Sequence, residues 1–299
     1  MGRPASVVCG RGCLPPDARQ AVDSDYRTPP RNGWPVAIID MHAHVFPDAL
    51  AMRVMPGMER EAGVRATYDG TLAGLLSVMD RAGIDVTVTQ PVATRPEQVP
   101  TINEWAATTA SERIVPFGAL HPDTPDPRAQ AARIRELGMR GIKLHPEFQA
   151  CAPDDPRMDA LCEAAAEHDL IVLFHAGADL AVPTRLGSPA SFARLLDRHP
   201  GLTAVLAHMG GWDMWDEVAE HLLGREIYLD TSYARGYLAE DTFLRMVREH
   251  GVDRVLFGTD GPWADAADEV GWITSLGLTP AETAAIMHDN ARALLDRHA

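Results

Sequence analysis

The stretch Ile38-Ile39-Asp40-Met41-His42-Ala43-His44 places two histidines, one residue apart, at the end of an apolar run. Such a run predicts a buried strand. Side chains on a strand alternate between its two faces, so Asp40, His42 and His44 are expected to share one face. Two neighbouring imidazoles on a rigid strand form half of a metal site, and later strands must supply the remaining ligands.

From Ile38 onward, the sequence repeats one pattern of a short apolar strand, a polar turn and an amphipathic helix. The strands are rich in Val, Ile, Leu and Phe, as expected for parallel strands that are buried on both faces. They are Ile38–His44, Val86–Val92, Ile114–Leu120, Gly141–His145, Ile171–His175, Thr203–His208, Ile227–Thr231 and Val255–Asp260. Eight strands alternating with helices predict an α/β fold, the (β/α)8 TIM barrel. A doubly wound sheet fits less well, because no glycine-rich phosphate loop follows the first strand.

Several helix boundaries are marked in the sequence. Glycines at the ends of expected helices predict left-handed caps at Gly138, Gly201 and Gly251. The connection from Val45 to Gly70 is long for a βα loop, and it is expected either to cover the barrel mouth as a lid or to pack on its rim. A capping side chain precedes a proline at four expected helix starts: Asp126-Pro127, Asp155-Pro156, Ser188-Pro189 and Thr279-Pro280.

The composition narrows the functional class. The chain has 299 residues, of which 46% are hydrophobic, and a formal net charge of −15. An acidic chain without a lysine-rich run argues against binding to nucleic acid or to an anionic membrane surface. No segment is long enough to span a membrane, and no signal peptide is evident. We therefore expect a cytoplasmic protein that acts on a small-molecule substrate.

The first part of the chain differs from the rest. Residues 1–36 are rich in Gly, Pro, Arg and Asp and show little periodicity, so they are expected to form a flexible leader before a single domain at residues 37–299. A wrongly assigned start codon is the alternative explanation. The four cysteines match no disulfide or zinc-ribbon spacing and are expected to be reduced thiols: Cys9, Cys13, Cys151 and Cys162.

Residues with metal-binding chemistry gather at the ends of the expected strands, where (β/α)8 barrels carry their active sites. Asp260 ends the last strand, and Lys143 lies near the end of the fourth. Five of the 12 histidines also lie at strand ends: His42, His44, His145, His175 and His208. A random placement would rarely give this pattern.

Four of these residues are the expected metal ligands. Neutral imidazoles and a carboxylate suit Zn²⁺, with one position left open for water, so we expect His42, His44, His175 and Asp260 to bind this ion. Manganese, cobalt and iron are alternatives. Asp40 is expected to hold a ligand or neighbouring backbone rather than the metal itself.

Five motifs make the chain similar to a known superfamily. They are Asp40-Met41-His42-Ala43-His44, Gly141-Ile142-Lys143-Leu144-His145-Pro146, Phe174-His175-Ala176-Gly177, Ala207-His208-Met209-Gly210-Gly211 and Phe257-Gly258-Thr259-Asp260. The chain resembles the amidohydrolase superfamily, and within it the branch that includes aminocarboxymuconate-semialdehyde decarboxylase. The resemblance covers roughly residues 38 to 296. It implies a TIM-barrel enzyme with one divalent metal ion and, more weakly, a homodimer.

The resemblance leaves two roles open for Lys143. Superfamily members with two metals use a carboxylated lysine on this strand as a bridge, and His175 and His208 would then bind the second ion. In the branch that this chain resembles, the lysine is an unmodified neighbour that orients the substrate. His145 lies on the same face and is also expected to bind the substrate. The branch resemblance favours one metal.

Two reactions fit such a centre. A metal lowers the pKa of its bound water from about 15.7 toward 7, which favours hydrolysis of a C–N or C–O acyl bond. Asp260 and His208 are the expected catalytic residues, which transfer protons or orient the water. The alternative is non-oxidative decarboxylation of a small unsaturated or aromatic acid. The residues alone favour hydrolysis, because a metal-bound water needs fewer additional groups.

The two reactions place different demands on the substrate pocket. A decarboxylase needs a cation for the substrate carboxylate, and Arg235, Arg95 and Arg185 are the candidates in the loops after expected strands. Trp212 and Trp263 are expected to line an apolar pocket in either case. A non-catalytic barrel that binds metal for structure is a third hypothesis, but structural zinc sites normally use four closed protein ligands.

Overall fold

The computed structural model describes residues 37–299, so the expected leader at residues 1–36, with Cys9 and Cys13, lies outside the described residues. The strands in this part of the chain are β1 (Ile39–Ala43), β2 (Val86–Thr89), β3 (Ile114–Pro116), β4 (Gly118–Ala119), β5 (Gly141–Leu144), β6 (Ile171–Phe174), β7 (Ala204–Leu206), β8 (Tyr228–Asp230) and β9 (Val255–Leu256). The α-helices are α1 (Asp48–Ala62), α2 (Leu72–Ala82), α3 (Val99–Ala107), α4 (Pro127–Glu136), α5 (Pro156–Glu167), α6 (Pro189–Arg198), α7 (Trp215–His221), α8 (Glu240–His250), α9 (Ala266–Ser275), α10 (Pro280–Ala284) and α11 (Asn290–Arg297). None of these helices has the length and apolar character that crossing a membrane requires.

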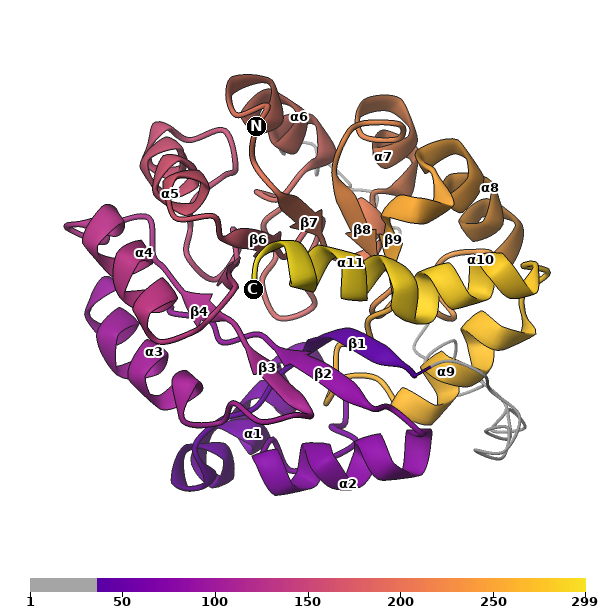
Figure 1. Cartoon of the computed structure of the whole chain (residues 1–299), viewed down its shortest axis with the longest axis horizontal. Helices are drawn as coiled ribbons and strands as arrows, with labels where there is room; N and C mark the ends of the chain where they lie inside the picture. The colour runs from indigo at the N-terminus through magenta and orange to yellow at the C-terminus, as the bar shows by residue number, and fades with distance from the viewer. Residues whose placement is uncertain (1–36) are drawn as a thin grey trace, which may run out of the picture.

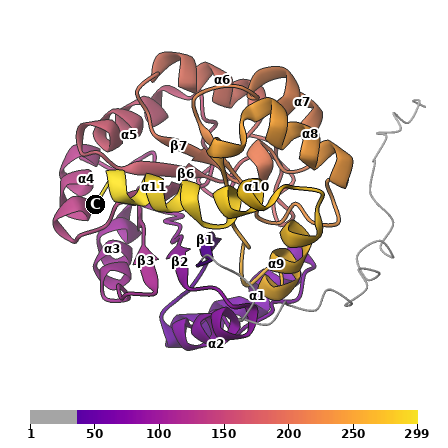
Figure 2. The same ribbon diagram turned by 45° about the vertical axis from the view of Figure 1, so that its right-hand side comes forward.

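The strands form a closed parallel barrel. Their order is β1-β2-β3 in one sheet and β4-β5-β6-β7-β8-β9 in the other. The barrel closes where Ala43 pairs with Gly261 and where the Met41 N–H donates to the Phe257 carbonyl at 2.8 Å. Figure 1 shows the strands at the centre with helices around them, and Figure 2 shows the same outer ring of helices from another side. The predicted (β/α)8 barrel is therefore the observed architecture.

The expected third strand, Ile114–Leu120, is divided into β3 and β4. Phe117 lies between the two, and its N–H donates to the Thr89 carbonyl of β2 at 3.0 Å. β3 continues the parallel pairing with β2, whereas β4 pairs with β5. The two short strands therefore occupy a single position in the barrel, which keeps eight positions in all.

Side-chain hydrogen bonds cap the N-termini of the helices whose starts the sequence predicts. At the start of α4, the Asp126 carboxylate accepts a hydrogen bond from the Ala129 N–H at 3.0 Å. Thr279 and Glu282 form a reciprocal capping box at α10. Side-chain caps also start α5 and α6 at the expected residues. These bonds satisfy N–H groups that have no partner inside the helix.

One of the three expected glycine caps is absent. Gly138 and Gly251 follow α4 and α8 with φ angles of 80° and 107°. Gly201 does not have a left-handed φ, so this prediction is wrong. The reason is that α6 ends at Arg198, before Pro200, whose ring cannot continue a helix. The chain therefore leaves the helix before it reaches the glycine.

Most of the segment between Val45 and Gly70, which is expected from the sequence to be a loop, is helix α1. Ala51 and Met55 lie one turn apart and are buried, whereas Met52 is 75% exposed. This division into a buried and an exposed face is what stabilises a helix at the edge of a barrel.

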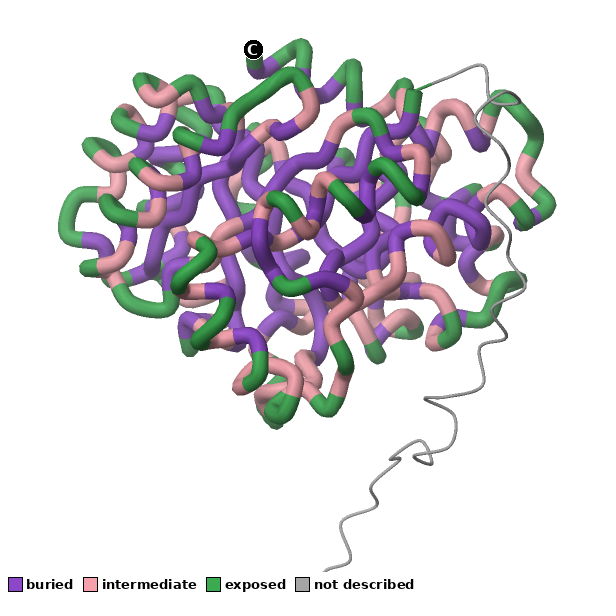
Figure 3. Tube along the Cα trace, turned by 90° about the horizontal axis from the view of Figure 1, so that it is seen from below, coloured by how far each residue is buried: buried purple, intermediate pink, exposed green. Residues whose placement is uncertain are grey.

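Buried residues fill the interior of the fold, as the purple segments of Figure 3 show, and most of them are apolar. A smaller cluster joins Ile39 and Ile171, the first residues of β1 and β6, to Leu294 and Leu295 of α11. α11 therefore covers the end of the barrel where the strands begin, and it lies across the strands in Figure 1. The opposite end of the barrel, where the strands finish, is not covered by α11 and carries the candidate site.

The Asp126 cap gives a test of the helix boundaries. Replacing Asp126 with Ala removes the acceptor for the Ala129 N–H and should lower the free energy of unfolding by about 1 kcal/mol. Asp126→Asn keeps an acceptor at the same place and should lose much less. Urea denaturation of the three proteins measures both differences, and equal loss in the two variants would contradict the capping role.

Candidate metal centre

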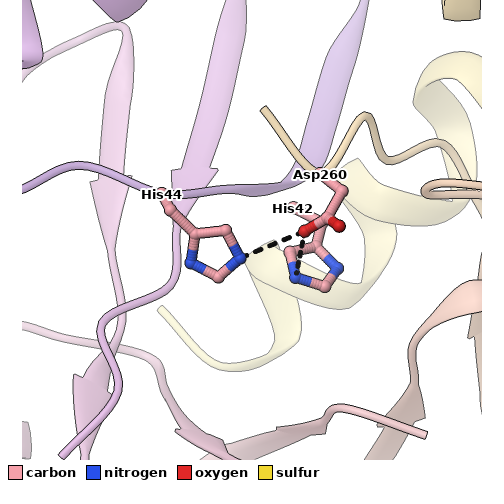
Figure 4. A group of neighbouring side chains, drawn as sticks. All are labelled: His42, His44 and Asp260. Carbon is pink, nitrogen blue, oxygen red and sulfur yellow. Dashed lines mark hydrogen bonds and ion pairs between the residues drawn. The ribbon is translucent and has the colours of Figure 1, made fainter. Parts of the chain in front are cut away.

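Three predicted ligands come together where the barrel closes. His42 and His44 lie at the end of β1, and Asp260 follows β9; their ligand atoms all lie within 4.8 Å of one another. Asp260 Oδ1 is 3.1 Å from His44 Nε2 and 3.4 Å from His42 Nε2, as the dashed lines in Figure 4 indicate. Residues separated by more than 200 positions therefore share one small volume, because the chain after β9 pairs with β1.

Backbone hydrogen bonds between β1 and the chain after β9 fix these three residues, and this contact is called the barrel seam. The Asp260 N–H donates to the His42 carbonyl at 2.7 Å, and the His44 N–H donates to the Gly261 carbonyl at 2.6 Å. Asp260 has a φ of 64°, a left-handed value that is rare for residues other than glycine. Such backbone strain is maintained only where surrounding contacts enforce it, and it clusters at functional sites.

Asp40 supports the seam as predicted and does not belong to the group of converging ligand atoms. Its carboxylate accepts hydrogen bonds from the His42 N–H at 2.9 Å and from the Thr259 N–H at 3.0 Å. The Thr259 hydroxyl donates a third bond at 2.8 Å. Burial raises the pKa of Asp40 to about 7, although the three hydrogen bonds oppose this effect. Asp40 thus joins β1 to the chain after β9, directly below the candidate metal ligands.

Hydrogen bonds set the orientation of both imidazoles. His42 Nδ1 lies 2.9 Å from Asp230 Oδ2, and His44 Nδ1 lies 2.7 Å from the Gln90 carbonyl oxygen. A carboxylate or carbonyl oxygen only accepts, so Nδ1 carries the hydrogen in each ring. Both Nε2 atoms therefore present lone pairs on the side that faces Asp260. A carboxylate or carbonyl behind an imidazole is the usual support of a metal-binding histidine.

The donor set fits a divalent metal ion. Burial and the nearby charge of Lys143 lower the pKa of His42 to about 4, so this ring is neutral, as metal binding requires. Two imidazole lone pairs and a carboxylate oxygen then face one another, and no ring hydrogen lies between either Nε2 atom and Asp260. A cation between them resolves this repulsion, and nitrogen and carboxylate oxygen are ligands of both zinc and manganese.

Lys143 lies beside this group rather than in contact with a carboxylate. Its Nζ is 3.0 Å from His42 Nε2, and the side chain is fully buried. Burial lowers the pKa of Lys143 to about 8, while Asp230 and Asp260 raise it. The amine therefore sits at the base of the candidate centre, beside His42.

His175 and His208 form a separate pair next to the three ligands. His175 Nδ1 is 3.1 Å from His208 Nε2, and His175 is not part of the group formed by His42, His44 and Asp260. His175 Nε2 donates to the Ala178 carbonyl at 3.1 Å, and His208 Nδ1 lies 3.0 Å from the Ser232 carbonyl. This leaves His175 Nδ1 and His208 Nε2 as acceptors, the form in which an imidazole binds a metal or takes a proton.

Asp230 is the important residue that sequence reasoning missed. It is fully buried at the end of β8, and besides His42 it accepts bonds from the His208 N–H at 3.0 Å and the Ser232 N–H at 3.1 Å. Burial raises its pKa, but the interactions with His42 and His208 and the hydrogen bond from the Ser232 side chain together lower the pKa to about 2. Its place at the end of an expected strand is the signal that could have identified it.

A cavity of about 770 Å³ opens above the candidate centre. Predicted site residues Lys143, His145, His175, His208 and Trp212 line it, together with the three converging ligands and Trp263. Its walls are mostly apolar and include Phe46, Leu50, Val54, Trp105, Phe148 and Leu180. Helix α1 contributes to one wall, so the segment between Val45 and Gly70 borders the site.

The arginines named from the sequence do not line this cavity. Arg235 instead pairs with Asp268 at 2.7 Å and Glu269 at 3.2 Å on α9. Arg95 pairs with Glu97 and Arg185 with Asp213. The sequence could show that these arginines follow strands, but it could not show the carboxylates that hold them elsewhere.

Arg53 is the arginine that does line the cavity, from helix α1. It is exposed, and it makes no hydrogen bond or ion pair with another residue in the part of the chain that the structure describes. The sequence pattern did not indicate Arg53, because its place on the cavity wall depends on the helix that Asp48–Ala62 forms. Arg53 therefore lies at the mouth of the cavity, because its side chain is exposed and also lines the cavity.

The support of His42 by Asp230 can be tested by Asp230→Asn. The three bonds from His208 and Ser232 to Oδ1 hold the amide, so its NH₂ group faces His42 Nδ1. The ring must then carry its hydrogen on Nε2, and metal affinity should fall 10- to 100-fold. Competition with a coloured chelator measures the affinity. Asp197→Asn, at an exposed ion pair with Arg225, is the control, and an Asp230→Asn protein that binds metal like the parent contradicts the role.

Solved structures share this architecture. An uncharacterized TIM-barrel protein from Bordetella bronchiseptica has a TM-score of 0.70 at 22% identity, covering 88% of this chain and 99% of that chain. A 2,6-dihydroxybenzoate decarboxylase from Rhizobium has a TM-score of 0.64 at 20% identity, with 88% and 100% covered. A 5-carboxyvanillate decarboxylase from Novosphingobium aromaticivorans, solved with manganese, has a TM-score of 0.66 at 17% identity, with 91% and 99% covered. At these identities the likeness shows the fold alone.

Sequence comparison adds the family. No curated protein matches the chain. The profile of the family described as Amidohydrolase matches residues 39–297, which include every strand of the barrel and all of the converging ligands. Because this match spans most of the sequence, the chain belongs to the amidohydrolase family.

Proposed function

We propose that this chain is a metal-dependent decarboxylase that releases CO₂ from a small carboxylic acid without an oxidant. The observation that carries the proposal is the buried amine of Lys143, which lies beside the three converging ligands at the base of a largely apolar cavity. A carboxylate that enters this cavity meets a cation at its base and apolar walls around it. Transfer from water into such surroundings favours reactions that disperse the charge.

The comparisons support decarboxylation over the hydrolysis that the residues alone favoured. Two of the structures with the same fold are named as decarboxylases of aromatic acids, and one of them was solved with manganese. Hydrolysis needs an activated water, whereas a buried cation next to the ligands suits a substrate carboxylate. We therefore take hydrolysis as the alternative outcome of the test.

The proposed reaction is R–COO⁻ + H⁺ → R–H + CO₂. The bond between the carboxylate and its carbon breaks, the electron pair stays on that carbon, and the carbon takes a proton. A divalent metal bound by His42, His44 and Asp260, with His175 as the proposed fourth ligand, would supply a Lewis acid for the substrate oxygen atoms. Lys143 binds the carboxylate, and His208 holds the proton that the carbon receives.

The aromatic walls suit a flat, unsaturated acid. Trp212, Phe148 and Trp105 line the cavity, and Trp212 packs edge-on against Tyr237 with ring centroids 5.3 Å apart. The Nε1–H of Trp212 is buried and has no hydrogen-bond partner among the described residues. An aromatic or unsaturated acid would stack against these rings.

Release of CO₂ is the test of the proposed function. The protein, stripped with a chelator and reloaded with Mn²⁺ or Zn²⁺, should release CO₂ from one or more acids in a panel that includes 2,6-dihydroxybenzoate and 5-carboxyvanillate. Lys143→Met should lower the rate at least 100-fold while metal content stays near that of the parent. A parent protein that hydrolyses amides or esters and releases no CO₂ from any acid would favour hydrolysis instead.

Arg53 should speed the capture of an anionic substrate. It is the cation at the mouth, so Arg53→Gln should lower kcat/KM for CO₂ release about 10-fold at low salt and leave kcat unchanged. The difference should shrink as ionic strength rises, because salt screens an exposed charge. Arg60→Gln, on the same helix but not lining the cavity, is the control. Equal effects of the two variants would contradict the role of Arg53.

A further inference from the structure

A second group of potential metal ligands lies in the wall of the same cavity. Atoms of His145, His175 and Asp179 are within 4.8 Å of one another. The rings of His145 and His175 are stacked, however, with centroids 4.0 Å apart and only 8° between their planes. Nitrogen lone pairs lie in the plane of the ring, so two parallel stacked rings cannot direct them to one ion. The group is therefore not a second metal site, and another reason for its arrangement is needed.

The surroundings of His145 hold its ring in place. Phe148 stacks on it with centroids 4.1 Å apart and 14° between planes, opposite to the contact with His175. His145 Nδ1 accepts a hydrogen bond from the Phe148 N–H at 3.3 Å, so the hydrogen of the neutral ring is on Nε2. This Nε2–H faces Asp179 Oδ2 at 3.6 Å. Both stacking faces of His145 and its Nδ1 are thus occupied by protein groups, and its Nε2 lies near the Asp179 carboxylate.

One short segment restrains both rings. Ala178 accepts the bond from His175 Nε2 at 3.1 Å, and the next residue, Asp179, faces His145 Nε2. The segment itself is fixed, because the Ala178 N–H donates to the Trp212 carbonyl at 3.0 Å. At Gly177, with a φ of 91°, an added Cβ would lie 2.1 Å from the Trp212 backbone nitrogen. This close contact leaves the segment little freedom to move.

We propose that His145 is a positioning residue, which holds the plane of the His175 ring by stacking, and that it does not bind substrate. The inference rests on the proposed function only in taking His175 as a ligand of the metal centre. The hydrogen bond from His175 Nε2–H to the Ala178 carbonyl restrains His175 within the plane of its ring, and His145 restrains the ring from one face. Together they keep His175 Nδ1 directed at His208, next to the other ligands. A stacked aromatic ring is enough for this role, whatever its hydrogen bonds.

The proposal predicts different effects for two substitutions at the same position. His145→Ala removes the stacking partner and should weaken the affinity for Mn²⁺ or Zn²⁺ 10- to 100-fold. His145→Phe keeps a flat ring between Phe148 and His175, so affinity should stay within about threefold of the parent. His121→Ala is the matched control, because His121 is equally buried at 5%, also accepts a backbone N–H on Nδ1, and does not line the cavity.

Metal affinity, measured by competition with a coloured chelator, and the visible spectrum of the Co²⁺ form separate the possible outcomes. Loss of affinity in His145→Ala with recovery in His145→Phe supports positioning by stacking. Equal loss in both variants shows that the hydrogen bonds of His145 matter instead and overturns the proposal. Unchanged affinity in both, with a raised KM for the acid, assigns His145 to substrate binding and overturns it as well.

A second measurement keeps this inference separate from the proposed function. A parent protein that binds no divalent metal contradicts the proposed function, and the position of the His175 ring is then read from ¹⁵N NMR of the histidine rings. The hydrogen on His175 Nε2 should persist in the parent and in His145→Phe, and it should exchange between the two nitrogens in His145→Ala. An unchanged His175 signal in His145→Ala would overturn the positioning role.

Discussion

The parallel contact between β1 and the chain after β9 both closes the barrel and assembles the candidate metal centre. The bonds from the Asp260 N–H to the His42 carbonyl and from the His44 N–H to the Gly261 carbonyl do both tasks at once. A shift of one residue in this pairing would turn the ligands to the wrong face. Asp40, held by Thr259, opposes such a shift, so the integrity of the fold and the geometry of the centre depend on the same few hydrogen bonds.

Around this seam, groups that only accept hydrogen bonds decide what each imidazole offers. Asp230 and the Gln90 carbonyl take the Nδ1 hydrogens of His42 and His44, and the Ala178 carbonyl takes the Nε2 hydrogen of His175. Each ring is left with one lone pair on the side of its neighbours. The protein therefore sets the tautomers before any ligand arrives, which is how supporting residues raise metal affinity.

The sequence predicts what depends on local spacing. Apolar runs and capping residues gave the barrel and most helix starts, and the strand-end histidines gave the residues that line the cavity. It could not predict pairings across the fold: Arg235 follows a strand, yet carboxylates of α9 hold it away from the cavity. Asp230 was passed over although it ends a strand, because its role depends on His42, which is 188 positions away. Helix α1, with Arg53, is hard to predict because Pro56 and Gly57, which disfavour a helix, lie inside it.

Helix α11 limits the routes by which molecules reach and leave the candidate site. Its apolar residues pack on the first residues of the strands, so, within residues 37–299, the barrel has no passage from the site through that end. Reactant and product must then use the same cavity mouth, between α1 and the loops around it. A molecule that binds in this mouth would block entry and exit together. Accumulated product would slow turnover, because it would occupy the path of the next reactant.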